Sequence, residues 1–307
     1  MPYPEIDVPR LVQLLQHPNG PCDVVIDTDT ANEIDDQFAI VHAILSEVLN
    51  VEAIYAAPFH TEWTQTSGPD EGMELSYQEI LRVLDKMHTA FSGPVLRGSA
   101  EYMSAPDRPV SSEAAGDLAA RAMADRDGPL YVLALGALTN VASAILVEPA
   151  IVSRMVVLPL GGSPYETGSF ADLNFTEDVH AVRVLFDSGV PVVHVVGYVV
   201  SEMMRTTEPE MSRYLKGRGA LGDYLYELYR DFVSDFPGRS KPIWDMAVGA
   251  WLMSPDWTSS HLTPSPIFNE GLRYSFDPTR HPVRVLTRVN RDAVFNDLFE
   301  KLETLNR

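Results

Sequence analysis

The stretch VVIDTDTANEIDDQFAI, residues 24–40, crowds acidic side chains between two apolar segments. Five acids fall within ten residues: Asp27, Asp29, Glu33, Asp35 and Asp36. Like charges at this density are unfavourable unless a positive group lies among them. The stretch therefore raises the question of which cation the chain gathers acids to hold.

The local pattern places these acids at the junction of a strand and a helix. VVID is typical of a strand end, so Asp27 and Asp29 should lie at its carboxyl end, on the same side. Asp35 and Asp36 then open a helix, where free N–H groups favour negative charge. Helix capping alone would explain one or two acids. Because several oxygens at one point are what Ca²⁺ or Mg²⁺ requires, we expect a metal site.

Short β-branched runs alternate with longer amphipathic segments through most of the chain. We expect strands near 24–27, 51–58, 130–135, 151–162 and 190–197, and helices near 34–48, 74–88, 139–147, 178–186 and 292–305. This alternation predicts a single-domain, Rossmann-like α/β fold with an open, mostly parallel sheet and helices on both faces. We expect one domain over 1–307, with 1–21 as an N-terminal extension and loops 60–72 and 163–174 over the site.

Composition narrows the classes of partner. The chain has 23 basic and 43 acidic residues, a net charge of −20, which disfavours nucleic acid and anionic membranes. Cys22 is the only cysteine, which excludes an intrachain disulfide or a cysteine-based zinc site. No apolar run of about 18 residues occurs, and the N-terminus is acidic and broken by proline. We therefore expect a cytoplasmic protein with a small-molecule substrate.

Further oxygen ligands would have to come from distant segments. Asp245 begins an apolar helix in KPIWDMAVGAWLMSP (241–255), and LALGALTN (133–140) follows a strand with a glycine turn. The set DTD…DD, LALGALTNVASAI, GGS…ADLNF and PIWD, in this order from about residue 22, resembles the nucleoside hydrolase family of the inosine–uridine-preferring type.

The resemblance implies a specific reaction and ligand set. Members of this family hydrolyse the N-glycosidic bond of ribonucleosides to ribose and free base at a tightly bound Ca²⁺. By position, Asp29 would be a calcium ligand and the general base that activates a metal-bound water. Asp36, the Leu135 carbonyl and Asp245 would complete the metal shell. Relatives form dimers and tetramers, so the resemblance also implies a homo-oligomer.

The same resemblance assigns residues to the sugar. Asp35 would bind ribose hydroxyls, and Asn174 would hold the far side of the ring together with Asp172, where the family usually has glutamate. The chemistry suits these residue types, because carboxylates stabilise the oxocarbenium character that develops on the sugar. The negative site should reject phosphate, so nucleotides should be poor substrates.

The chain departs from the family pattern at three places. The turn from Asp29 to Asp35 is longer by two residues around Asn32 and Glu33, and Asn32 is either a ribose contact or part of a surface bulge. His60 stands where the family commonly offers asparagine to the ribose; it is either a site residue or structural.

Trp244 replaces the histidine that protonates the leaving base in the inosine–uridine-preferring enzymes. A purine-specific branch also has tryptophan there, so Trp244 would stack on a purine, with Trp63 as a second ring; alternatively it packs at the helix start. Other aromatic candidates for base contacts are Tyr165, Tyr224 and Tyr229.

Two other functions remain open on the sequence. The DTDT motif after a strand also resembles a haloacid-dehalogenase-like phosphohydrolase. That mechanism needs a lysine that holds the phosphate and a second acidic pair far downstream, but the chain has only four lysines, Lys86, Lys216, Lys241 and Lys301, and no later pair of adjacent aspartates. A calcium- or ribose-binding homologue with impaired catalysis is the non-enzymatic alternative.

Overall fold

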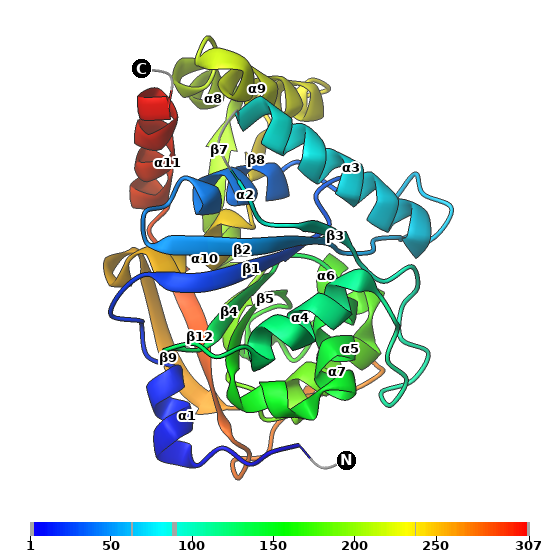
Figure 1. Ribbon diagram of the computed structural model, residues 1–307. Helices are drawn as coiled ribbons and strands as arrows, with labels where there is room; N and C mark the ends of the chain where they lie inside the picture. Colours follow the sequence, from blue (N-terminus) through cyan, green and yellow to red (C-terminus); the bar gives the residue numbers. More distant parts are fainter. Residues whose placement is uncertain (1–2, 63, 88–90, 237, 306–307) are drawn as a thin grey trace.

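The computed structural model is built around an eight-stranded sheet whose first strand lies in its interior (Figure 1). It describes residues 3–62, 64–87, 91–236 and 238–305. The strand order is β3-β2-β1-β4-β5-β6-β12-β9, and within this sheet only β9 runs antiparallel to its neighbour. The strands are β1 (Cys22–Thr28), β2 (Leu49–Ala56), β3 (Val95–Arg97), β4 (Leu130–Ala134), β5 (Met155–Gly161), β6 (Val193–Val196), β9 (Thr258–Pro264) and β12 (Pro282–Val289).

Helices cover both faces of this sheet, which confirms the predicted fold class. Figure 1 shows α2 on one side of β1 and β2, with α4, α5 and α7 together on the other side. The α-helices are α1 (Val8–Leu14), α2 (Asp36–Ile44), α3 (Pro69–Met87), α4 (Glu113–Met123), α5 (Thr139–Val147), α6 (Leu173–Glu177), α7 (Val179–Asp187), α8 (Glu208–Tyr214), α9 (Gly219–Val233), α10 (Met246–Met253) and α11 (Arg291–Leu305). Two small antiparallel sheets of two strands each pair β7 (Arg205–Thr207) with β8 (Ser240–Pro242), and β10 (Ile267–Phe268) with β11 (Tyr274–Ser275).

The central strands form because they are apolar along their whole length. Val24, Val25 and Ile26 of β1 are fully buried, as expected for a parallel strand covered on both faces. The edge strand β9, with the sequence TSSHLTP, is mostly exposed or half-buried. An edge strand has one free side and needs no continuous apolar run, which is why its pattern is weak in the sequence.

Element boundaries differ from the sequence prediction at a few places. Helix α3 begins at Pro69 rather than near 74, because proline suits the first turn of a helix. The first of the two expected long loops is therefore shorter. Helix α4, which we did not predict, is capped by the Ser112 hydroxyl, which accepts from the Ala115 N–H at 3.1 Å.

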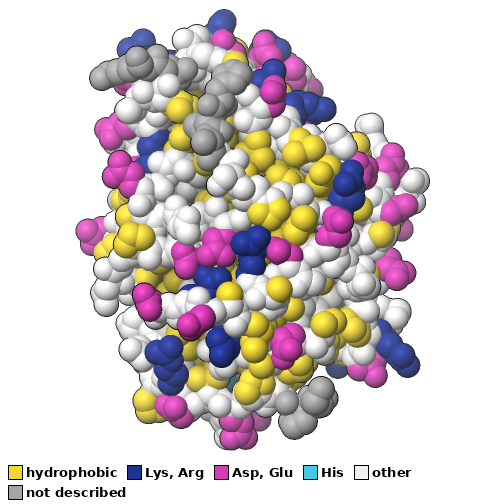
Figure 2. Space-filling view, viewed as in Figure 1, with side chains coloured by type: hydrophobic (Ala, Val, Ile, Leu, Met, Phe, Trp, Pro, Cys, Tyr) yellow, Lys and Arg dark blue, Asp and Glu magenta, His cyan; other side chains and the backbone are white. Residues whose placement is uncertain are grey.

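The segment before β1 packs against the sheet. Helix α1 buries Leu11 and Leu14, and the Arg284 side chain of β12 donates to the Leu15 carbonyl. Among the described helices, none combines the length and apolarity needed to cross a membrane. Figure 2 shows acidic and basic side chains interspersed over the visible face rather than gathered in one patch of a single sign.

The strand order reverses at β1, and this reversal positions the site. Strand β2 lies on one side of β1 and β4 on the other, with Asp27 opposite Tyr55 and Ala134. In open α/β sheets a crevice forms at such a reversal, outside the carboxyl ends of the strands. The acidic stretch begins at that end of β1.

Candidate active site and metal centre

The carboxyl ends of β1 and β4 bring Asp29 and Leu135 together. The Leu135 N–H donates to the Asp27 carbonyl at 2.7 Å, which extends the strand pairing by one residue. A side chain at Gly136 would reach within 2.7 Å of the Asp29 carboxylate, so only glycine lets the two segments approach this closely. The glycine turn of LALGALTN therefore lies against Asp29.

Asp27 makes the hydrogen bond that connects the end of β1 to α5. Its carboxylate accepts a hydrogen bond from Asn140 at 2.8 Å, and Asn140 also accepts from the N–H of Ser99 at 2.7 Å. Burial raises the pKa of Asp27 to about 7. Asp27 thus joins β1 to the first turn of α5, and it lies near the carboxyl end of the strand, as predicted.

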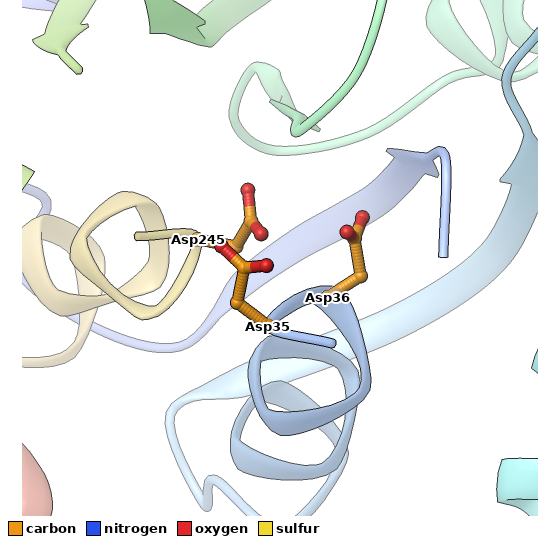
Figure 3. Close-up of side chains that lie close together, drawn as sticks. All are labelled: Asp35, Asp36 and Asp245. Carbon is orange, nitrogen blue, oxygen red and sulfur yellow. The ribbon is translucent and has the colours of Figure 1, made fainter. Parts of the chain in front are cut away.

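Three carboxylates converge from two helix starts. Asp35 and Asp36 lie at the beginning of α2, and Asp245 lies at the beginning of α10 (Figure 3). One oxygen from each lies within 4.8 Å of the others, and all three residues are buried. Helices α2 and α10 pack against each other, which holds the two starts together. This spacing suits a shared cation, because carboxylate oxygens are the ligands that hard divalent ions prefer.

The charges in this cluster oppose one another. Burial raises the pKa of Asp36 well above its usual value, and Asp29 and Asp35 raise it further. Burial likewise raises the pKa of Asp245, with Asp36 and Asp35 adding to the effect. The pKa of Asp29 is also raised, first by burial and then by Glu177. Asp29, Asp36 and Asp245 are therefore buried beside like charges, and a divalent cation among them would relieve the repulsion.

Lys241 supplies one positive charge beside the cluster. Its ammonium donates to Glu33 and lies 3.3 Å from Asp35, and its side chain is 6% exposed. Burial opposes its charge, but Asp35 and Glu33 raise its pKa above the usual value. The other oxygen of Asp35 accepts from the Trp244 N–H at 3.1 Å. Asp35 is therefore fixed by two donors from the segment before α10.

The longer acidic turn has defined contacts. The Asn32 amide donates to Asp29 Oδ2 at 2.7 Å, and the Asn32 N–H donates to the Asp29 carbonyl at the same distance. Glu33 pairs with Lys241 across the turn. Both extra residues of the turn therefore have defined polar partners, Asn32 with Asp29 and Glu33 with Lys241.

The loop after β5 supplies the opposite wall. Asn174, on α6, donates to the Leu135 and Leu160 carbonyls, the latter at 3.2 Å. Asp172 caps α6 by accepting from the Phe175 N–H at 3.0 Å, and loss of water around its carboxyl raises its pKa to about 7. The Leu135 carbonyl, expected to bind the metal, accepts a hydrogen bond from Asn174 in this structure.

One pocket collects most of the residues predicted from the sequence. It encloses about 580 Å³, including the part open to solvent, within the range of small-molecule sites. Every charged residue that lines it is acidic. Its lining includes Asp29, Asn32, Glu33, Asp35, Asp36, Leu135, Asp172, Asn174, Trp244 and Asp245.

Other candidates lie elsewhere. His60 is not among the pocket residues; its N–H donates to Glu177 at 2.9 Å and its ring contacts Thr66. Tyr229 is fully buried, and the Tyr224 hydroxyl donates to Glu79. The Tyr165 hydroxyl is 2.9 Å from a ring nitrogen of His194, and neither Tyr165 nor the other two tyrosines lines the pocket. Trp63 lies outside the described residues.

Two residues at the site were not identified from the sequence. Glu177, near Asp29 but outside the pocket lining, has a buried oxygen without a hydrogen-bond partner among the described residues, and burial raises its pKa to about 8. Its place one helical turn after Asn174 is the signal that could have identified it. Tyr198 lines the pocket two residues after β6, and its position beyond the carboxyl end of a parallel strand was the available signal.

Comparison with known proteins identifies a family and relatives that this chain resembles. The family model described as inosine-uridine preferring nucleoside hydrolase matches residues 24–296. The pyrimidine-specific ribonucleoside hydrolase RihB of Escherichia coli K12 is 28% identical over 199 residues, and the match covers 58% of each chain.

Two solved structures show the same fold. A plant nucleoside hydrolase is 21% identical, with a TM-score of 0.70 over 92% of this chain and 99% of that chain. An inosine-guanosine nucleoside hydrolase is 18% identical, with a TM-score of 0.72 over 92% of this chain and 98% of that chain.

Proposed function

The chain belongs to the inosine-uridine preferring nucleoside hydrolase family, and on this basis we propose that it hydrolyses the N-glycosidic bond of ribonucleosides at a Ca²⁺ site. The observation that carries the proposal is the convergence of Asp29, Asp35, Asp36 and Asp245 in one pocket beside Trp244. The products would be ribose and the free base, and water would be the second substrate.

The hydrogen bonds of the acids support a division of roles. Asp36 accepts from Thr28, whereas both oxygens of Asp35 accept from donors near α10. Asp36 and Asp245 would therefore hold the ion, with Asp29 and the Leu135 carbonyl. A carbonyl has two lone pairs, so Leu135 can serve the ion while it accepts from Asn174. When bound, Ca²⁺ would orient sugar hydroxyls and lower the pKa of a nearby water.

Asp29 is the proposed general base. Its carboxylate lies in the pocket against the Leu135–Gly136 turn, and Asn32 binds Oδ2. In the balanced reaction the water oxygen bonds to C1′ and one water proton passes to Asp29. The C1′–N bond breaks with its electron pair going to the base, which then takes up a proton.

The remaining acids act on the sugar. Asp35 is held by Lys241 and Trp244, so its position is fixed before a sugar hydroxyl arrives. Asn174 and Asp172 face the pocket from α6 and its cap. Because the lining is acidic, it would stabilise positive charge on the sugar ring and repel a nucleotide phosphate.

Trp244 favours purine ribosides among the substrates. It is half-buried, lines the pocket and lies directly before Asp245, so its ring borders the space where a base would project from the sugar. A two-ring base gains more stacking area than a one-ring base. The name inosine-guanosine nucleoside hydrolase, carried by one structural relative, fits this preference, whereas RihB is named for pyrimidine nucleosides.

A panel of nucleosides tests the proposal. The calcium-loaded protein is incubated with inosine, guanosine, adenosine, uridine, cytidine and inosine 5′-phosphate, and both ribose and free base are quantified. We expect release from purine ribosides to exceed release from uridine, with little from the nucleotide. Asp29→Ala should reduce release by about a thousandfold or more, the order of a lost general base and ligand together. Absence of ribose from every riboside would contradict the proposal.

A further inference from the structure

Tyr198 lines the pocket, although no motif in the sequence identified it as a site residue. It lies two residues after the end of β6, is 45% exposed and lines the pocket with Gly197. Its N–H donates to the Gly162 carbonyl at 3.2 Å, which ties it to the end of β5. The next residue, Val199, has φ of 72°, a conformation that is costly for a β-branched side chain. The backbone thus holds Tyr198 at the pocket against local strain.

The ring of Tyr198 meets Trp244 at a right angle. Their centroids are 5.9 Å apart and the planes are inclined by 86°. The Trp244 backbone is itself fixed by its hydrogen bond to Asp35. Two perpendicular rings form a corner in which a flat heterocycle can stack on one ring and contact the other with its edge.

The Tyr198 hydroxyl has no hydrogen-bond partner within the described part of the chain, unlike the hydroxyls of Tyr224 and Tyr229. Burial, followed by Asp172, Glu33 and Glu202, raises the pKa of Tyr198 above the ordinary value. The phenol therefore stays protonated at neutral pH and is available as a donor. Two of these acids, Asp172 and Glu33, also line the pocket.

We propose that Tyr198 contacts the nucleobase, its ring forming the second wall of the base site with Trp244 and its hydroxyl donating a hydrogen bond to the departing base. This inference rests on the proposed hydrolase function and names the residue that serves the leaving group. As the C1′–N bond breaks, negative charge develops on the base, and a phenolic donor stabilises that charge. This hydroxyl would provide the hydrogen-bond donor that Trp244, which cannot protonate the base, does not supply.

Two substitutions separate the hydroxyl from the ring. Tyr198→Phe removes only the donor, and Tyr198→Leu also removes the aromatic wall. Tyr214→Phe is the matched control, because Tyr214 is equally exposed at 44% but stacks on Phe299, outside the residues that line this pocket. Each variant is assayed in calcium with inosine and with 4-nitrophenyl riboside, whose leaving group needs no donor.

The two substrates give distinct expectations. Tyr198→Phe should lower kcat/KM for inosine by about tenfold, the order of one lost hydrogen bond to developing charge, and leave 4-nitrophenyl riboside within twofold. Tyr198→Leu should in addition raise KM for inosine. If Tyr198→Phe retains full activity on inosine, or loses activity equally on both substrates, the inference is overturned.

Binding of the products distinguishes this inference from the proposed reaction. Hypoxanthine and ribose are titrated separately into the calcium-loaded protein by calorimetry. Tyr198→Leu should weaken hypoxanthine binding by about tenfold and leave ribose binding unchanged. A wild-type chain that releases no ribose from any riboside would refute the reaction, while the hypoxanthine titration would still decide the role of Tyr198. Equal hypoxanthine affinity in wild type and Tyr198→Leu, or no hypoxanthine binding by wild type, would overturn the inference.

Discussion

The hydrogen bond between Asn32 and Asp29 gives the longer acidic turn a chemical role. Asn32 was a candidate ribose contact, and its position in the pocket leaves that proposal open. Its amide also fixes Oδ2 of the proposed general base. A carboxylate that is buried among other acids has few ways to satisfy its oxygens, so one well-placed amide restricts its orientation strongly.

We predict that Asn32→Ala lowers kcat for inosine by about tenfold, because a catalytic carboxylate would lose one oriented hydrogen bond. Steady-state ribose release measures the effect. Asn50→Ala is the matched control: Asn50 makes the same kind of bond, to Asp23 at 2.8 Å, at the opposite end of β1. Equal kcat in both variants would contradict a positioning role for Asn32.

At the scale of elements, a salt bridge connects the acidic turn to the start of α10. Glu33 and Asp35 both contact Lys241 of β8, and Asp35 also binds the Trp244 backbone. Strand β8 is far from β1 in sequence and is not part of the eight-stranded sheet. The side chains of the acidic turn therefore connect β8 to the end of β1, a connection that the strand pairing of the main sheet does not make. This link fixes the position of Asp35, the proposed sugar ligand, relative to Trp244, the proposed base contact.

We predict that Lys241→Met lowers the unfolding free energy of the calcium-free protein by about 3 kcal/mol, because it leaves Asp35 buried without its partner. Glu33→Gln should lower the unfolding free energy by a smaller amount, because the Glu33 side chain is 40% exposed and its charge is screened by water. Denaturant unfolding of both single variants and the double variant measures the coupling. Strictly additive losses would show that the bridge does not act as a unit.

The turn after β4 imposes a second constraint. We predict that Gly136→Ala lowers kcat by about a hundredfold while the fold persists, because the added carbon would displace the Asp29 carboxylate. Gly128→Ala, in the turn before β4, meets nothing within 4 Å and should be neutral. Circular dichroism checks folding and ribose release checks activity. Wild-type activity in Gly136→Ala would show that Asp29 is not held against this turn.

Sequence patterns identified the elements whose physical requirements are local. The apolar run of β1 and the acids of α2 are visible because burial and helix-start charge act on neighbouring residues. The pairing of Glu33 with Lys241 joins residues 208 positions apart, which no local pattern encodes. Tyr198 escaped notice because a tyrosine after a strand has no distinctive spacing. The extra turn residues were visible, but their partners depended on the fold.

At the scale of the whole molecule, the acidic pocket concentrates unfavourable charge in a sheet that is otherwise apolar. Burial raises the pKa of Asp27 and of Asp172 to about 7, and it raises the pKa of Asp29, Asp36 and Asp245 as well. An unfolded carboxyl group has a pKa near about 4. Between roughly pH 4 and pH 7 the unfolded chain therefore releases protons that the fold retains, and stability without calcium falls as pH rises.

We predict that calcium stabilises the protein more at pH 8 than at pH 5, because only ionised carboxylates bind the ion. At a calcium concentration of about 1,000 times Kd, the gain at pH 8 should be about 4 kcal/mol, which corresponds to a rise in Tm on the order of 10 °C. Thermal unfolding at both pH values, with calcium or with chelator, measures the difference. An equal rise at both pH values would contradict an ion held by these carboxylates.

The central claim is that the acidic cluster holds one Ca²⁺ that hydrolysis of a riboside requires. The direct test measures bound calcium and ribose release from inosine on the same preparation, before chelation, after chelation and after calcium is restored. The account predicts one calcium per chain, loss of ribose release when the ion is removed, and recovery when it returns. Undiminished ribose release from a chain shown to contain no metal would contradict it.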